Sequence, residues 1–125
     1  EVTGAYFTAN GERVRSKSEI IIADHLRRYG VVYKYEKPLE LTVHGRRVTF
    51  YPDFTVMNSR TGRIYYLEHF GMMDNEDYYN AVLRKLDAFE MNQLLIGRDV
   101  LLLHESSSAP LNTRVLDCYI QEYLV

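Results

Sequence analysis

The chain has 125 residues, 46% of them hydrophobic and 26% charged, and its 15 lysines and arginines against 17 aspartates and glutamates give a net charge of −2. This length fits a single domain over residues 1–125, and the composition excludes disordered, collagen-like and coiled-coil proteins. This slightly negative net charge excludes a nucleic-acid-binding protein whose whole surface is basic. It is compatible with a local basic patch.

The first half of the chain predicts one helix followed by short strands. Residues 16–29 have helical periodicity, Ser16 and Glu19 have the spacing of a capping box, and Gly30 marks the end. Runs rich in Val, Tyr, Thr and Phe then predict strands over residues 31–35, 40–43, 47–57 and 63–70.

The second half predicts a helix, a buried strand and a closing helix. The helix covers residues 75–91 with Asp74 as its N-cap, the strand covers residues 100–104, and an amphipathic helix covers residues 112–124. This order predicts an α/β fold, in which helices flank a mixed central sheet and a helical crossover leads to the last strand.

Cysteine content and hydropathy indicate where the protein works. Cys118 is the single cysteine, so no disulfide forms within the chain, which fits a reducing compartment. No apolar run approaches the ~20 residues that a membrane-spanning helix needs. We therefore expect a cytoplasmic protein without membrane contact. The sequence begins at Glu1 rather than at a methionine, so we also expect it to be a piece of a longer protein.

Three carboxylates fall where the pattern is otherwise apolar. Glu19 lies on the apolar stripe of the first helix, where it either caps the helix or faces a cleft. Asp53 follows Pro52 in a strand-like run, where the proline implies a bend; the side chain then either points out of the sheet or ends the strand in solvent. Glu68 lies in the next run, and a turn near Arg60 brings residues 53 and 68 opposite each other. Such carboxylates repel unless one binds a proton or a cation lies between them, and oxygen ligands suit Mg²⁺ or Mn²⁺.

A lysine also falls on an apolar stripe. Lys85 shares one face of the predicted helix over residues 75–91 with Val82 and Phe89. It either extends along the apolar surface or reaches the carboxylates, where it would orient a water or stabilise charge on a phosphoryl oxygen. Three carboxylates and a lysine are the groups that metal-assisted phosphodiester hydrolysis uses.

The arrangement of Glu19 on the first helix, Pro52-Asp53 on a strand and Glu68 on the next strand, 15 residues later, resembles the PD-(D/E)xK nuclease superfamily. The resemblance spans about residues 14–104. It implies a restriction-endonuclease-like αβββαβ core, and the C-terminal helix that the periodicity predicts lies beyond that core. It also implies a metal-dependent nuclease that hydrolyses DNA with Mg²⁺, for which Mn²⁺ can substitute. Glu19, Asp53 and Glu68 would then be catalytic residues and metal ligands.

This sequence has no lysine at the position where the family carries its motif lysine. The family lysine follows the motif glutamate by two residues, which here is Phe70. Some members carry it on the next helix, and the resemblance then makes Lys85 the catalytic lysine. Residues 67–72 also resemble a subgroup with Glu-His and then Gly, found in nuclease-like domains attached to helicase-like or phage-associated proteins. That subgroup implies the backbone carbonyl of His69 as a further metal ligand, and fusion to or recruitment by such a protein. The His69 ring is either a general base or ligand next to Glu68 or a structural group, and its alternation to the opposite face of the strand favours the structural role.

Three functional hypotheses remain open. The first is the metal-dependent nuclease acting on DNA. The second is a catalytically inactive nuclease-fold domain that binds DNA or a protein partner, which the phenylalanine at the lysine position motivates. The third is an interaction domain that forms a homodimer through the tyrosine-rich helix over residues 78–89. In the first, the candidates for phosphate contacts are Arg13, Arg15, Lys17, Lys34 and Arg46.

Overall fold

The computed structural model describes residues 5–125, which form an α/β fold with three α-helices, one four-stranded mixed sheet and two small hairpins. The helices are α1 (Lys17–Arg28), α2 (Glu76–Met91) and α3 (Thr113–Tyr119), and α3 runs on into a π-helical turn, η1 (Ile120–Leu124). The strands are β1 (Tyr6–Phe7), β2 (Arg13–Val14), β3 (Val32–Tyr35), β4 (Leu39–Val43), β5 (Arg46–Phe50), β6 (Phe54–Met57), β7 (Ile64–Phe70) and β8 (Val100–His104). Within the described residues, no helix is both long enough and apolar enough to cross a membrane.

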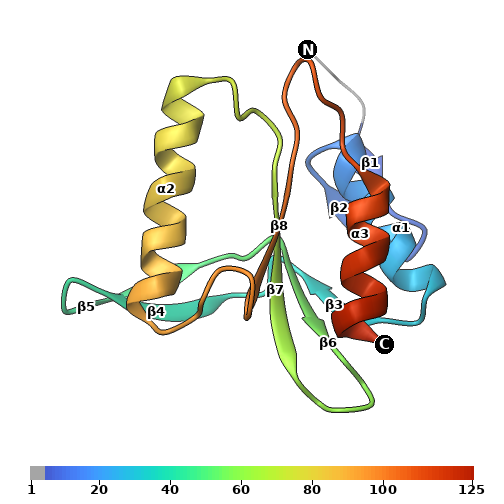
Figure 1. Ribbon diagram of the computed structural model, residues 1–125, viewed down its shortest axis with the longest axis horizontal. Coiled ribbons are helices and arrows are strands. Elements are labelled where there is room, and N and C mark those ends of the chain that lie inside the picture. The colour runs from blue at the N-terminus through green and yellow to red at the C-terminus, as the bar shows by residue number, and fades with distance from the viewer. Residues whose placement is uncertain (1–4) are drawn as a thin grey trace.

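The central sheet has the strand order β3-β6-β7-β8. β3, β6 and β7 pair antiparallel, whereas β7 and β8 pair parallel and are joined through α2. The predicted mixed sheet with a helical crossover is therefore confirmed. Figure 1 shows α1 and α3 on one side of the sheet and α2 on the other.

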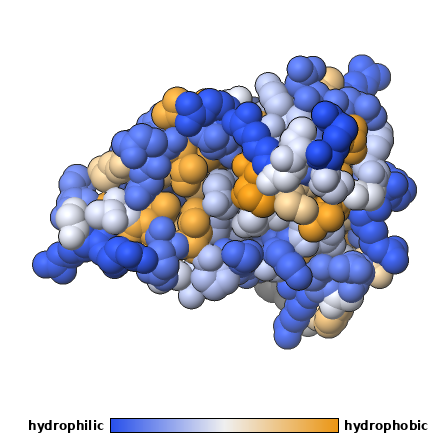
Figure 2. Space-filling model, turned by 90° about the horizontal axis from the view of Figure 1, so that it is seen from below, coloured by the Kyte–Doolittle hydropathy of each residue, from blue (hydrophilic) through white to orange (hydrophobic). Residues whose placement is uncertain are grey.

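The hairpin of β4 and β5 extends from the central sheet as an arm alongside α2 (Figure 1). His44 and Gly45 close it with positive φ angles of 49° and 79°, which a two-residue hairpin turn of the I′ type requires. Apolar side chains of the arm face α2, where Leu41 packs with Phe89. Seen from below, apolar residues are visible among hydrophilic ones on this face of the molecule (Figure 2), and Val48 of β5 is an exposed apolar residue of the arm.

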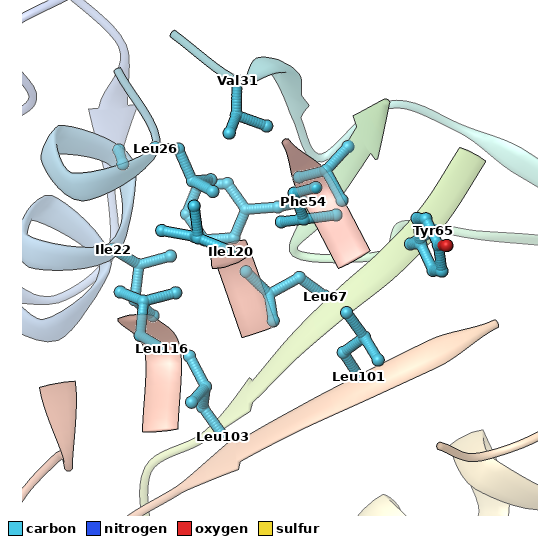
Figure 3. Close-up of a cluster of buried hydrophobic side chains, with 13 residues drawn as sticks. Ile22, Leu26, Val31, Phe54, Tyr65, Leu67, Leu101, Leu103, Leu116 and Ile120 are labelled. Atoms are coloured by element: carbon cyan, nitrogen blue, oxygen red, sulfur yellow. The ribbon is translucent and has the colours of Figure 1, made fainter. Parts of the chain in front are cut away.

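The main core lies between the sheet and the layer of α1 and α3 (Figure 3). On α1, Ile22 and Leu26 are fully buried against Phe54 of β6 and Leu67 of β7. The helix begins and ends as its sequence predicts. The Ser16 hydroxyl accepts a hydrogen bond from the backbone N–H of Glu19, and the chain leaves the helix through Gly30 at a φ of 73°.

Two sequence predictions about elements need correction, and one hairpin is an addition to them. The strand predicted over residues 47–57 is two strands, β5 and β6, which belong to different sheets. They separate at Pro52, because a residue without an N–H cannot continue a hydrogen-bonded ladder. The side chain that caps α2 is Asn75 rather than Asp74, and it accepts from the N–H of Tyr78. The β1–β2 hairpin was not predicted, since two-residue strands are too short to show a period.

Asn92 fixes the arm to α2. Its side-chain amide accepts a hydrogen bond from the Thr42 N–H (3.0 Å) and donates to the Thr42 carbonyl (3.0 Å) and to the Ala88 carbonyl (2.8 Å). The side chain thus pairs with β4 as a neighbouring strand would. This holds α2, and with it Lys85, in a fixed position relative to the arm.

Replacing Asn92 by alanine should lower the free energy of unfolding by about 1–3 kcal/mol, because the Thr42 and Ala88 backbone groups lose their partners. The measurement is chemical denaturation of the wild type, Asn92→Ala and the control Asn80→Ala. Asn80 is exposed on α2 and makes no side-chain hydrogen bond within the described residues, so its replacement should leave stability unchanged or slightly raised. Equal stability of both variants would contradict this account of the arm.

Candidate active site

A cleft of about 520 Å³ lies between the start of α1 and the middle of α2, beside the end of β7. Four of the residues singled out in the sequence line it: Glu19, Asp53, His69 and Lys85. Glu68 is fully buried directly behind them. The structure therefore brings the predicted catalytic and metal-binding residues to one place, whereas of the predicted phosphate contacts only Arg15 lines this cleft.

Asp53 and Glu68 meet because of the register between β6 and β7. Phe54 pairs with Leu67, so the next position places Asp53 opposite Glu68, as the hairpin spacing predicts. The backbone N–H of Asp53 donates to Glu68 Oε2 at 2.9 Å. Asp53 Oδ2 in turn accepts from the backbone N–H of His69 at 2.7 Å. Each carboxylate is thereby held by the backbone of the other strand.

Lys85 reaches this pair from the other side of the cleft. Its Nζ forms an ion pair with Glu68 Oε1. The position follows from the phase of α2, since Val82 and Phe89, on the same face, are buried. Of the two alternatives for Lys85, contact with the carboxylates is the one that the structure shows. Phe70, at the family position of the lysine, is buried.

Glu19 is connected to Asp53 through an arginine. The Nη2 atom of Arg15 lies 3.1 Å from Asp53 Oδ1, 3.5 Å from Glu19 Oε2 and 2.9 Å from Glu36 Oε2. Glu19 Oε1 also accepts from the backbone N–H of Arg15 (2.8 Å) and from the Tyr35 hydroxyl (2.9 Å). The Glu19 carboxylate therefore binds the backbone just before α1 and also lines the cleft.

Sequence reasoning missed two members of this cluster. Arg15 was considered only for phosphate contacts, and Glu36 was not considered at all. Arg15 directly precedes the N-cap of α1, and Glu36 follows β3 with a positive φ of 51°. Neither position has a periodic signal, because both lie where the chain leaves regular structure.

The His69 side chain lies on the face of β7 opposite to that of Glu68, as strand alternation predicts. Its Nε2 is 3.3 Å from Glu105 Oε1, which also accepts from the Ser18 hydroxyl at 2.8 Å. The ring lies over Gly71, where an added Cβ would come within 3.2 Å of it. The ring thus links β7 to the segment after β8, which agrees with a structural role.

The charged forms of the buried Asp53 and Glu68 carboxylates are disfavoured. Burial raises the pKa of Glu68 to about 7, and the Asp53 carboxylate adds to this rise while the Lys85 ammonium opposes it. Burial also raises the pKa of Asp53, against the opposing effects of Lys85 and of the His69 N–H. The cations present therefore do not fully compensate the negative charge.

The chemistry of these groups fits a hard divalent cation. The Asp53 and Glu68 side chains supply carboxylate oxygens, which are the ligands that Mg²⁺ prefers, and their raised pKa values indicate that additional positive charge would be favourable. A ready-made cluster of three or more acidic, histidine or cysteine ligands is absent among residues 5–125. Two carboxylates, with a backbone carbonyl and waters, are a sufficient set for Mg²⁺, which keeps several waters when bound.

Comparison with known proteins gives one distant similarity. The chain is 30% identical over 123 residues to Uncharacterized protein MJ1519 of Methanocaldococcus jannaschii, and the match covers 88% of this chain and 10% of the relative. The chain thus spans about a tenth of the length of that protein. No protein-family model matches the sequence, and no solved structure is significantly similar to it.

The raised pKa of Glu68 predicts that stability falls as the pH rises. An acid with a higher pKa in the folded state binds its proton more tightly there than in the unfolded chain. The free energy of unfolding should therefore decrease between the ordinary value of 4.5 and the folded value of about 7. We expect a decrease of about 1–3 kcal/mol over this window.

Denaturation in EDTA at several pH values tests this prediction on the wild type, on Glu68→Gln and on Glu90→Gln. Glu68→Gln should flatten the pH dependence, whereas Glu90→Gln, at an exposed position of α2, should retain it. A wild type that becomes more stable between pH 5 and 7.5 would show that Glu68 is compensated in the folded state.

Proposed function

We propose that this chain is a metal-dependent nuclease domain with a restriction-endonuclease-like αβββαβ core, and that it hydrolyses phosphodiester bonds in DNA. The observation that carries the proposal is the convergence of Asp53, Glu68 and Lys85, with Asp53 and Lys85 lining one cleft and Glu68 buried directly behind them. The order of α1, β3, β6, β7, α2 and β8 also agrees with that core.

Asp53 and Glu68 would hold Mg²⁺, together with the backbone carbonyl of His69, and Glu19 lies at the edge of this set. The bound cation would activate a water as nucleophile and offset the charge of the phosphate. Mn²⁺ would serve in the same way. The raised pKa values of Asp53 and Glu68 support this proposal, because a divalent cation would favour their ionised forms.

Lys85 would orient the attacking water or stabilise the phosphoryl oxygens. Its Nζ is paired with Glu68, and its side chain is 22% exposed and lines the cleft. An ammonium that is already in place needs no reorganisation when charge develops on the phosphate. On this proposal Lys85 takes the role of the lysine that Phe70 replaces.

DNA would approach along the face that the arm and α2 share. A second cleft of about 540 Å³ runs between them and shares Ala81 and Lys85 with the first. Arg84 lines it, and Arg46 is exposed at the start of β5. Backbone phosphates are bound through such side chains with little dependence on base sequence.

A catalytically inactive binding domain is the second candidate. The observation that favours it is the pairing of Arg15 with three carboxylates, which compensates part of their charge without a metal. Such a domain would bind DNA or a protein partner in EDTA as well as in Mg²⁺. Cleavage assays distinguish the two candidates.

We expect the chain to cut labelled linear, supercoiled or branched DNA with Mg²⁺ or Mn²⁺ and not in EDTA. Asp53→Asn should reduce cleavage to background, because the amide is a poorer ligand for the cation. Lys85→Met should lower the rate by about 10²-fold or more, because it removes a charge that stabilises the transition state.

The control is Arg114→Met, which removes an exposed cation of α3 that does not line the cleft. Its cleavage rate should equal that of the wild type. Circular dichroism verifies that each variant is folded. Cleavage that survives in Asp53→Asn would exclude this site, and the absence of cleavage by the wild type with every metal would favour the binding domain.

A further inference from the structure

We propose that Arg15 is an exchangeable cation of this site: the divalent metal displaces its guanidinium from Asp53, and the released guanidinium then binds a phosphate of the DNA. Metal and DNA would consequently bind cooperatively. This inference rests on the proposed function, because it assigns an order and a coupling to the same metal and the same substrate.

The position of the guanidinium is the first argument. Its Nη2 is 3.1 Å from Asp53 Oδ1, the oxygen of Asp53 that the His69 N–H leaves free. Glu36 Oε2 lies 2.9 Å away on the other side. A cation held by Asp53 Oδ1 would occupy the space that this guanidinium now takes.

The freedom of the side chain is the second argument. The Arg15 side chain is 66% exposed, whereas those of Asp53 and Glu19 are 5% and 4% exposed. The guanidinium therefore reaches from solvent toward buried carboxylates. Its backbone is anchored, since the Arg15 N–H donates to Glu19 Oε1 at 2.8 Å. The side chain can turn outward without disturbing the entry to α1.

Charge balance is the third argument. Four carboxylates surround the two cations Arg15 and Lys85, namely Glu19 of α1, Glu36 after β3, Asp53 and Glu68. A fifth carboxylate, Glu105, lines the cleft beside the His69 ring. Lys85 is already paired with the fully buried Glu68. A divalent cation at Asp53 would repel the nearby guanidinium, which is always charged.

A phosphate is the natural acceptor for the displaced guanidinium. Arginine offers a planar set of N–H donors that matches phosphate oxygens in a bidentate arrangement. Arg15 lines the cleft in which the scissile phosphate would lie. DNA would thus bind Arg15 best when metal has released it, and by reciprocity the metal would bind best when DNA holds Arg15 away.

The test measures metal affinity without DNA and without catalysis. Isothermal titration calorimetry with Mn²⁺ compares the wild type, Arg15→Gln and the control Arg114→Gln, all in the 125-residue chain. Arg15→Gln should bind Mn²⁺ about fivefold or more tightly than the wild type, because the competing cation is gone. Arg15→Lys keeps a cation and should stay near the wild type, and Arg114→Gln should be unchanged.

A second measurement tests the coupling to DNA. The affinity for a labelled DNA is measured by fluorescence anisotropy in EDTA and in Ca²⁺, a hard cation that oxygen ligands also accept. Ca²⁺ should raise the DNA affinity of the wild type by about fivefold or more, and this gain should shrink in Arg15→Gln. Thermal denaturation verifies that both proteins are folded.

The outcomes separate this inference from the proposed function. Equal or weaker Mn²⁺ binding by Arg15→Gln, with clear binding by the wild type, would overturn the role of Arg15 and leave the nuclease proposal standing. It would mean that Arg15 is a fixed structural ion pair. No Mn²⁺ binding by either protein would overturn both proposals.

Discussion

The carboxylate of Glu68 is the constraint on which the rest of the site depends. A fully buried charge in a sheet is costly unless hydrogen bonds and an opposite charge compensate it. The N–H of Asp53 and the ammonium of Lys85 supply both, and each comes from a different element. The bend after β5, the register of β6 on β7 and the phase of α2 are all needed to bring these groups together. The raised pKa of Glu68 shows that the compensation is incomplete.

The parts of the site that regular structure positions could be predicted from the sequence. Hairpin register places Asp53 opposite Glu68, and helical phase puts Lys85 on the face of α2 that meets the sheet. The α/β class and the crossover to β8 follow from the order of the elements in the same way. These features depend on periods of two and of 3.6 residues, which a sequence displays directly.

The remaining parts could not be predicted because they depend on where the chain departs from regular structure. Arg15 lies just before α1. Glu36 follows β3, and its own backbone is in the left-handed region. Their meeting with Asp53 depends on loop paths that no local pattern encodes. The separation of the arm from the central sheet could not be predicted for a related reason, since β5 and β6 lie in one strand-like run in which only Pro52 marks the change of sheet.

The crossover through α2 has a consequence for how the domain folds. β3, β6 and β7 precede α2 in the chain, so they are synthesised before Lys85. Closing these three strands alone would bury Glu68 without its cation. The antiparallel part of the sheet therefore gains its full stability only after α2 docks and β8 pairs with β7. A truncated or nascent chain that ends before α2 lacks both Lys85 and β8, and it therefore has no assembled site.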